Sequence, residues 1–250
     1  MKIGALIIGD EILSGKRRDQ HFHHLQTVLA QRGLELNWTV ICGDDASDLC
    51  RFLSLTLHSE DLVFSFGGIG ATPDDRTRQA VAKAAQVPLE RHPEAVAEIE
   101  AQYGNQAYPH RILMAELPKG STIIPNPVNR VPGFSFEHHH FMPGFPDMAW
   151  PMIEWVLNHH YPDLYNTRPE AECTIFISQA RESVLIDTMT TILAQYPQLQ
   201  LSSLPHLGPH PYIEFSLRGK QHDIIAAMAI MTQFLDKQGY PWAREASTST

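Results

Sequence analysis

The first half of the chain alternates short apolar runs with amphipathic segments. Mostly apolar residues occupy 2–9 and 62–66. Between these runs, the segment 20–32 carries apolar residues at helical spacing and ends before Gly33. Short apolar runs bounded by glycine are typical of strands buried in a parallel sheet. The alternation therefore predicts an α/β fold with a mostly parallel sheet and right-handed crossovers. The predicted elements are strands at 2–9, 36–42 and 62–66 and helices at 20–32, 49–58, 79–85, 93–103, 111–116 and 149–159.

A different order of elements follows the polar, proline-bounded segment 161–169, which we interpret as a linker. Strand, helix, strand, strand and helix are predicted at 173–177, 182–195, 199–204, 212–217 and 222–237. This order suits a smaller α+β domain with an antiparallel sheet. We therefore expect a first domain at 1–162, a second domain at 168–240 and a terminal tail at 241–250.

Composition places the chain among globular proteins and argues against two classes of partner. Its 250 residues are 43% hydrophobic and carry a net charge of −9. The negative charge argues against nucleic-acid binding, and no apolar run approaches the roughly 18 residues of a membrane span. Three unclustered cysteines and the lack of a signal-peptide pattern lead us to expect a cytoplasmic protein without disulfides or a membrane partner.

The segment 65–77, between the strand at 62–66 and the next helix, carries the most informative motif. Its glycines and acids are Gly67, Gly68, Gly70, Asp74 and Asp75. Glycine turns between a strand and a helix let backbone N–H groups contact an anion. Because carboxylates repel bare phosphate, the two acids indicate a divalent cation, and oxygen ligands suit Mg²⁺. The alternative is a plain strand-to-helix connection in which Asp74 caps the helix.

Two well-known phosphate-binding patterns do not match this loop. The P-loop requires Gly-Lys followed by Ser or Thr, and the loop has no lysine. The dinucleotide fingerprint requires a third glycine where Pro73 stands. The segment is therefore a phosphate loop of another kind or an ordinary connection.

A second acidic cluster follows the first predicted strand. Gly9 ends that strand, and Asp10 and Glu11 come next, with Asp19 near the start of the following helix. Ligands of parallel α/β sheets bind beyond the carboxyl ends of the strands. We therefore expect Asp10 and Glu11 to share an edge of the sheet with the glycine loop.

These motifs resemble a known family. The segments that carry the resemblance are Gly9–Gly15, Gly67–Thr77, Leu117–Gly120, Asn126–Val128, Pro132–Phe134 and Met142–Pro146. In this order they resemble the molybdopterin-binding domain of molybdenum cofactor biosynthesis proteins, and more closely the amino-terminal part of the competence/damage-inducible CinA proteins. The resemblance covers about the first 160 residues, a usual length for one domain. Residues 168–240 more loosely resemble the small KH-like or ferredoxin-like domain of CinA relatives.

The resemblance implies a three-layer first domain that binds a small phosphate-bearing ligand. CinA-type domains are associated with metal-dependent hydrolysis of ADP-ribose-like pyrophosphates. In that case Asp75 is the leading ligand of Mg²⁺ or another divalent cation, Asp45 is a second choice, and Asp74 and Glu11 assist catalysis. The residues expected to bind the ligand are Gly9, Asp10, Gly67, Gly68, Gly70, Thr72, Pro143 and Gly144.

Alternatives remain open at this point. The wider family binds molybdopterin and some members adenylylate it, so molybdopterin is a second candidate ligand. A non-catalytic pterin- or nucleotide-binding protein is another, favoured by the segment 19–21, Asp-Gln-His, where relatives usually carry asparagine. We also expect a homo-oligomer that lacks the carboxy-terminal amidohydrolase domain of full-length CinA.

Two groups of histidines remain to be placed. His21 falls near the first acidic loop, so we expect it to be able to face the ligand. His138, His139 and His140 are consecutive, and neighbours on a strand point to opposite faces. We therefore interpret the triplet as polar strand or turn residues rather than a metal centre.

Overall fold

The structure is a computed structural model that describes residues 1–166 and 171–244. The chain forms two compact units, 1–167 and 168–250. Among the described residues, no helix is both long enough and apolar enough to cross a membrane.

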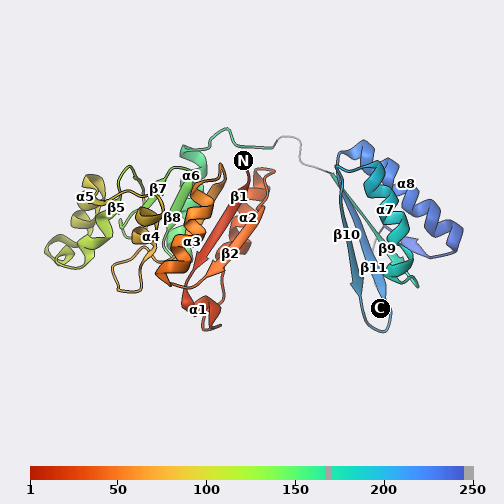
Figure 1. The fold of residues 1–250 in the computed structure, drawn as a ribbon, viewed down its shortest axis with the longest axis horizontal. Coiled ribbons are helices and arrows are strands. Elements are labelled where there is room, and N and C mark those ends of the chain that lie inside the picture. Colours follow the sequence, from red (N-terminus) through yellow and green to blue (C-terminus); the bar gives the residue numbers. More distant parts are fainter. Residues whose placement is uncertain (167–170, 245–250) are drawn as a thin grey trace. The chain divides into compact units, whose positions relative to one another are not determined.

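A six-stranded sheet forms the centre of the first unit (Figure 1). Its strands lie in the order β2-β1-β3-β8-β7-β6. β2, β1, β3 and β8 pair in parallel, whereas β7 and β6 are antiparallel additions at one edge. The strands are β1 (Ile3–Ile8), β2 (Trp38–Cys42), β3 (Leu62–Phe66), β6 (Thr122–Ile124), β7 (Gly133–Phe136) and β8 (His139–Met142). The predicted mostly parallel sheet is thereby confirmed.

Helices cover both faces of this sheet and make it the middle of three layers. α2 and α6 bury Leu25 and Ile153 against one face, and α3 and α4 bury Leu53 and Val81 against the other. The helices are α1 (Asp10–Leu13), α2 (His21–Gln31), α3 (Ala46–Leu57), α4 (Thr77–Ala84), α5 (Pro93–Tyr103) and α6 (Pro146–His159). Two 3₁₀ helices, η1 (Gly104–Ala107) and η2 (Arg111–Ala115), and the strand pair β4 (Leu89–Arg91) and β5 (Glu116–Pro118) complete the unit.

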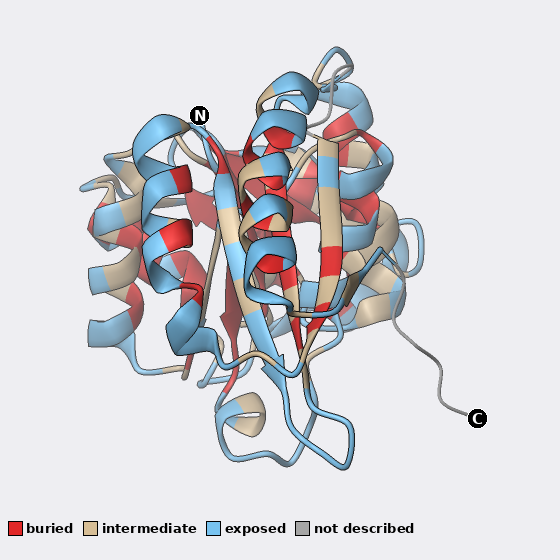
Figure 2. Cartoon of the chain, turned by 90° about the vertical axis from the view of Figure 1, so that its right-hand side faces the viewer, coloured by how far each residue is buried: buried red, intermediate tan, exposed pale blue. Residues whose placement is uncertain are grey.

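The second unit is an antiparallel sheet in the order β10-β11-β9-β12 with two helices packed on it. Its elements are β9 (Ala171–Ser178), η3 (Glu182–Val184), α7 (Ile186–Gln195), β10 (Gln200–His206), β11 (Tyr212–Gly219), α8 (Gln221–Gln238) and β12 (Trp242–Ala243). Buried positions lie along β9 and β11 and on one side of α7 and α8 (Figure 2). The expected α+β layer is present, although the helix expected at 182–195 is divided into η3 and α7.

The segments expected to be linker and tail are partly built into the two units. Tyr161 and Leu164 pack against the core of the first unit, and the Asn166 N–H donates to the Arg32 carbonyl at 2.9 Å. In the second unit, Trp242 and Ala243 pair with β9, so residues just after 240 belong to the sheet. Their apolar side chains gain more from burial than a solvated tail offers. Residues 167–169 and 245–250 lie outside the described residues.

His139 and His140 lie on strand β8, one of the two placements that the sequence suggested, but each is a core residue, 1% exposed. His140 contacts the Ser135 hydroxyl at 2.8 Å and the Tyr161 hydroxyl at 3.0 Å, whereas neither His139 nitrogen has a partner among the described residues. Burial lowers the pKa of His139 to about 4 and the pKa of His140 to about 3. Both imidazoles are therefore neutral near pH 7, which makes their burial tolerable.

Candidate functional site

A pocket of about 430 Å³ lies beyond the carboxyl ends of β1, β3 and β8. Neighbouring parallel strands end at the same edge, so their following loops converge there. All the site residues predicted from the sequence line this pocket, except Asp10 and Asp45. Its lining comprises Ile8, Gly9, Glu11, Arg17, Asp44, Gly67, Gly68, Ile69, Gly70, Ala71, Thr72, Asp74, Asp75, Tyr103, Met114, Asn126, Asn129, Val131, Pro143, Gly144, Phe145 and Met148.

The glycine loop needs glycine because its backbone is closely packed. Gly67 and Gly68 have φ values of 104° and 68°, and a Cβ at Gly67 would lie 2.3 Å from the Ile8 carbonyl oxygen. A Cβ at Gly144 would lie 3.4 Å from the Gly67 Cα. The loops after β1, β3 and β8 therefore meet backbone to backbone, which holds the floor of the pocket in place.

Asp75 organises the second half of the loop. Its Oδ2 accepts the Thr72 N–H at 2.9 Å and the Thr72 hydroxyl at 2.5 Å. The Thr72 hydroxyl, which we expected to donate to phosphate, is thus engaged by a carboxylate. A Cβ at Gly70 would meet the same Oδ2 at 2.4 Å, so Gly70 makes room for this side chain.

A buried guanidinium holds the glycine loop in place through hydrogen bonds to backbone carbonyls. Arg78 on α4 is 3% exposed and donates to the carbonyls of Gly70, at 2.6 Å, Glu116, at 3.0 Å, and Leu113. Burial lowers the pKa of Arg78, while nearby Asp75 and Glu116 act in the opposite direction. The glycine loop, η2 and β5 are therefore held together through one side chain.

α4 begins three residues after Asp74, so Asp74 does not cap the helix and the alternative interpretation of the loop is wrong on this point. The helix starts at Thr77 with Arg76 in the cap position and no side-chain cap. The Thr77 N–H and hydroxyl instead bond to the carbonyls of Gly68, at 3.0 Å, and Gly67, at 3.1 Å. Asp74 is thereby left exposed at the pocket.

Four carboxylates line the pocket: those of Glu11, Asp44, Asp74 and Asp75. Of the described residues in the lining, Arg17 alone is basic. Burial raises the pKa of Asp44, and the carboxylates of Asp10, Glu11 and Asp74 raise it further, against a backbone hydrogen bond from Asp10 that lowers it. The pocket therefore carries more negative charge than its own side chains neutralise.

The two predicted acids outside the lining have structural partners. Asp45 is the N-cap of α3, and its Oδ1 accepts the N–H groups of Ser47 and Asp48 at 2.9 and 3.1 Å. The Asp10 N–H donates to the Asp44 carboxylate, and the Asp44 N–H donates to the Asp10 carboxylate. Within 1–166 and 171–244, no group of three or more His, Cys, Asp or Glu side chains is arranged to hold a metal ion. Asp45, the second-choice metal ligand, therefore caps α3 and does not line the pocket with Asp75.

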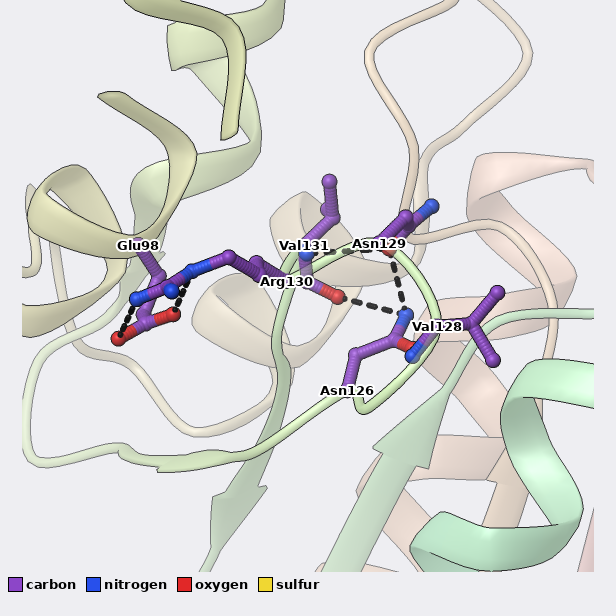
Figure 3. Close-up of polar contacts among 6 residues, drawn as sticks. All are labelled: Glu98, Asn126, Val128, Asn129, Arg130 and Val131. Carbon is purple, nitrogen blue, oxygen red and sulfur yellow. Dashed lines mark hydrogen bonds and ion pairs between the residues drawn. The ribbon is translucent and has the colours of Figure 1, made fainter. Parts of the chain in front are cut away.

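The far wall of the pocket was missed by sequence reasoning. Tyr103, Met114 and Met148 come from α5, η2 and α6, and Asn129 comes from the loop between β6 and β7 (Figure 3). Apolar residues at these places are expected in any core, so no local signal marks them. Two other lining residues had a local signal: Arg17 follows the segment Gly9–Gly15, and Asp44 follows the strand predicted at 36–42.

A second pocket of about 320 Å³ shares a wall with the first. The residues common to both are Ile8, Glu11, Arg17, Gly144 and Phe145. The second pocket adds Arg18, Asp19, Gln20 and His21. His21 is 5% exposed and stacks on Phe66 at 4.4 Å. Burial lowers the pKa of His21, against the Gly144 backbone and Asp19, so a neutral imidazole forms part of this wall.

Residues 4–164 match the family model described as "Probable molybdopterin binding domain". The chain belongs to this family. Every residue that lines the two pockets lies within the matched range, so the site is part of the molybdopterin-binding domain itself.

Several CinA proteins are similar to this molybdopterin-binding-domain chain. A CinA-like protein of Geotalea uraniireducens is 26% identical over 264 residues, covering 99% of this chain and 61% of the relative. A CinA-like protein of Sulfurihydrogenibium is 35% identical over 137 residues, covering 54% of this chain and 34% of the relative. The chain thus spans only about a third to three fifths of these relatives.

A solved structure agrees with the fold. The crystal structure titled as the protein CinA with unknown function, from Thermoplasma acidophilum, is 27% identical with a TM-score of 0.57. The matched region covers 62% of this chain and 96% of the Thermoplasma acidophilum chain. The molybdopterin-binding-domain fold is therefore supported by sequence and by structure.

Proposed function

We propose that this protein binds a pterin or nucleotide that carries a diphosphate, and hydrolyses the diphosphate with the help of a divalent cation. The observation that carries the proposal is the meeting of four carboxylates and a glycine loop in one pocket at the carboxyl edge of a parallel sheet. Backbone N–H groups of such a loop suit phosphate oxygens, whereas the carboxylates suit a cation beside them.

The residues present fit a hard divalent cation. Burial raises the pKa of Asp44, and the neighbouring carboxylates of Asp10, Glu11 and Asp74 raise it further; a bound cation would relieve the repulsion among these carboxylates. Mg²⁺ commonly binds through one or two carboxylates, with phosphate oxygens and water completing its ligands. A preassembled group of three protein ligands is therefore not required. Glu11, Asp44 and Asp75 would hold the cation, which when bound supplies stabilisation of charge on the phosphate oxygens.

In the proposed reaction, water adds to phosphorus and the bond from phosphorus to the bridging oxygen breaks, which for ADP-ribose yields AMP and ribose 5-phosphate. Asp74, which is exposed and caps no helix, would orient the attacking water, whose proton is released to solvent. Hydrogen bonds from the Thr72 hydroxyl and from the Asp74 backbone lower the pKa of Asp74, which disfavours it as the proton acceptor. Arg17 stands on the wall shared by both pockets and would face the departing phosphate. The bridge between the two halves would then lie at that shared wall.

The two adjoining pockets support a ligand with two organic halves. Together they offer separate spaces on either side of Glu11, Arg17 and Gly144. ADP-ribose has this form, with an adenosine and a ribose joined by a diphosphate. The family description names molybdopterin, so it supports a pterin ligand and does not by itself favour ADP-ribose.

A non-catalytic carrier of molybdopterin or a nucleotide is the second candidate. The engagement of the Thr72 hydroxyl by Asp75 and the lack of a preassembled metal group among the described residues favour it. Both candidates bind the same ligand class, so turnover separates them. Adenylylation of molybdopterin would use the same acids, but it would form a phosphoanhydride on the ligand instead of breaking one.

Product analysis tests the proposal. Wild type is incubated with ADP-ribose with and without Mg²⁺, and AMP and ribose 5-phosphate are quantified by chromatography. Asp75→Asn and Glu11→Gln each remove one charge and should lower the rate about 100-fold or more. Asp48→Asn removes an exposed carboxylate outside the pocket and should leave the rate unchanged. Tight binding of ADP-ribose with no turnover would replace the hydrolase by the carrier.

A further inference from the structure

The loop between β6 and β7 contains a closed set of amide hydrogen bonds (Figure 3). Asn126 is 5% exposed, and its Nδ2 donates to Asn129 Oδ1 at 2.8 Å and to the Val131 carbonyl at 3.0 Å. Its Oδ1 accepts the Val128 N–H at 3.0 Å. Both amide hydrogens and the oxygen of Asn126 are therefore used inside the loop.

This set determines which way the Asn129 amide faces. Asn129 Oδ1 accepts both Asn126 Nδ2 and the Val131 N–H, the latter at 3.0 Å. Two donors fill the two acceptor positions of an amide oxygen, so exchange of the oxygen and nitrogen would set donors against donors. The Asn129 nitrogen must therefore point away from the loop, as Figure 3 shows.

One hydrogen of this nitrogen is left over. Asn129 Nδ2 contacts the Met148 sulfur at 3.6 Å, and a thioether is a weak acceptor of a single hydrogen bond. Among the described residues, its second N–H has no partner. Asn129 lines the first pocket with Tyr103, Met114 and Met148, so a free donor stands beside apolar and aromatic surface.

The backbone under Asn129 is held in a costly conformation. Arg130 has a φ of 59°, which non-glycine residues seldom adopt. Its guanidinium makes two hydrogen bonds to Glu98 on α5, at 2.9 and 3.1 Å, and its N–H donates to the Asn126 carbonyl at 3.0 Å. An exposed ion pair adds little stability, but a two-point contact sets orientation. Strain that the surroundings maintain in this way is common beside ligands.

We propose that Asn129 determines ring specificity by donating a hydrogen bond to a ring nitrogen or carbonyl oxygen of the heterocycle. The ring lies against Tyr103, Met114 and Met148, and its phosphate reaches the glycine loop. Pterins and purines both present such acceptors beside a flat apolar face. The assignment rests on the proposed function for the phosphate end of the ligand, and it adds a binding position for the heterocycle at the other end.

AMP and ribose 5-phosphate form a matched pair of probes because they share the phosphorylated ribose, and AMP carries adenine where ribose 5-phosphate carries a hydroxyl group. Titration calorimetry on the full chain gives the ratio of their dissociation constants, and this ratio cancels effects on the phosphate. We expect wild type to prefer AMP. Asn129→Asp keeps an acceptor for Asn126 and Val131 but replaces the free donor, so the preference should fall about tenfold, the effect of one hydrogen bond.

Two further variants separate loss of the donor from effects of added charge. Asn129→Leu removes the donor without adding charge and should lose the same preference, with thermal unfolding reporting whether the loop survives. Asn105→Asp adds a charge at an exposed position outside the pocket and should keep the wild-type ratio. An unchanged ratio in both Asn129 variants, or equal binding of the two probes by wild type, overturns the assignment. Failure of ADP-ribose turnover with an intact AMP preference would refute the hydrolase alone.

Discussion

Asp10 and Asp44 each accept a hydrogen bond from the other's backbone: the Asp10 N–H lies 2.9 Å from Asp44 Oδ2, and the Asp44 N–H lies 3.2 Å from Asp10 Oδ1. The pair ties the loop after β1 to the loop after β2 at the edge of the pocket. Its cost is a concentration of negative charge, because Glu11 and Asp74 also act on Asp44.

Asp44→Asn should therefore stabilise the protein in cation-free buffer near neutral pH. The amide oxygen can still accept the Asp10 N–H, while the repelling charge is gone. Because the pKa of Asp44 is raised in the folded state, the stability linked to its protonation is present below 3.8 and is lost as pH rises through the folded-state pKa. Thermal unfolding from pH 3.5 to 7 should show a flatter profile for the variant. A variant less stable than wild type at neutral pH would contradict this reasoning.

The same variant should lose the response to a divalent cation. In wild type, a cation at one hundred times its dissociation constant adds about 2.7 kcal/mol to the free energy of unfolding. Unfolding temperatures with and without Mg²⁺ measure the difference, with Asp48→Asn as the charge-matched control. Equal Mg²⁺ responses of wild type and Asp44→Asn would remove Asp44 from the cation's ligands.

Gly67→Ala should destabilise the first unit far more than Gly15→Ala. Both glycines have positive φ, at 104° and 73°, so both substitutions strain the backbone by about 1–2 kcal/mol. At Gly67 the new methyl group also meets the Ile8 carbonyl, which adds about 1–3 kcal/mol, whereas a Cβ at Gly15 meets nothing within 4 Å. Urea unfolding of the pair measures the difference. Equal losses would show that the loops are not packed as described.

Arg78→Met should lower the free energy of unfolding by about 3 kcal/mol, because three partly buried carbonyl oxygens lose their donor. Arg76→Met is the control, since Arg76 is exposed and makes one hydrogen bond to the Pro73 carbonyl at 3.3 Å. That variant should stay within about 0.5 kcal/mol of wild type. Denaturant midpoints of similar size for the two variants would mean that Arg78 does not hold the loop.

His139→Leu and His140→Leu should have opposite effects. His139 has no hydrogen-bond partner among the described residues, so an apolar replacement should be neutral or stabilise by about 1 kcal/mol at pH 7. His140→Leu leaves the hydroxyls of Ser135 and Tyr161 unpaired and should cost about 1–3 kcal/mol.

The two variants also differ from wild type in pH dependence. A lowered histidine pKa gives stability that is present above 6.5 and lost as pH falls through the folded-state value, which is about 4 for His139. His139→Leu should therefore unfold less readily than wild type at pH 5. Urea unfolding at pH 7 and pH 5 tests both points, and loss of stability in His139→Leu at both values would indicate an unrecognised partner.

Local pattern was sufficient for strands β1, β2 and β3 and for the sheet edge at which the pocket lies, whereas β6, β7 and β8 were not placed from it. Apolar runs bounded by glycine mark buried strands such as β1 and β3, and parallel strands place their following loops at one edge. Gly67, Gly70, Asp75 and Glu11 could therefore be placed at a common edge from spacing alone. These inferences depend on neighbours along the chain, which is why they were accessible.

Tertiary structure decided the rest, because the remaining roles depend on which atoms meet. Asp44 and Asp45 are adjacent, yet the start of α3 uses Asp45 as its cap and leaves Asp44 facing the pocket. Asn129 and Met148 become neighbours only when β7 joins the sheet and α6 packs against it, so no local signal could connect the two residues. The sequence by itself determined at which edge of the sheet the glycine loop and the acids would meet. Long-range packing chose the side chains that complete it, since a side chain's partners are set by the fold and not by its position in the chain.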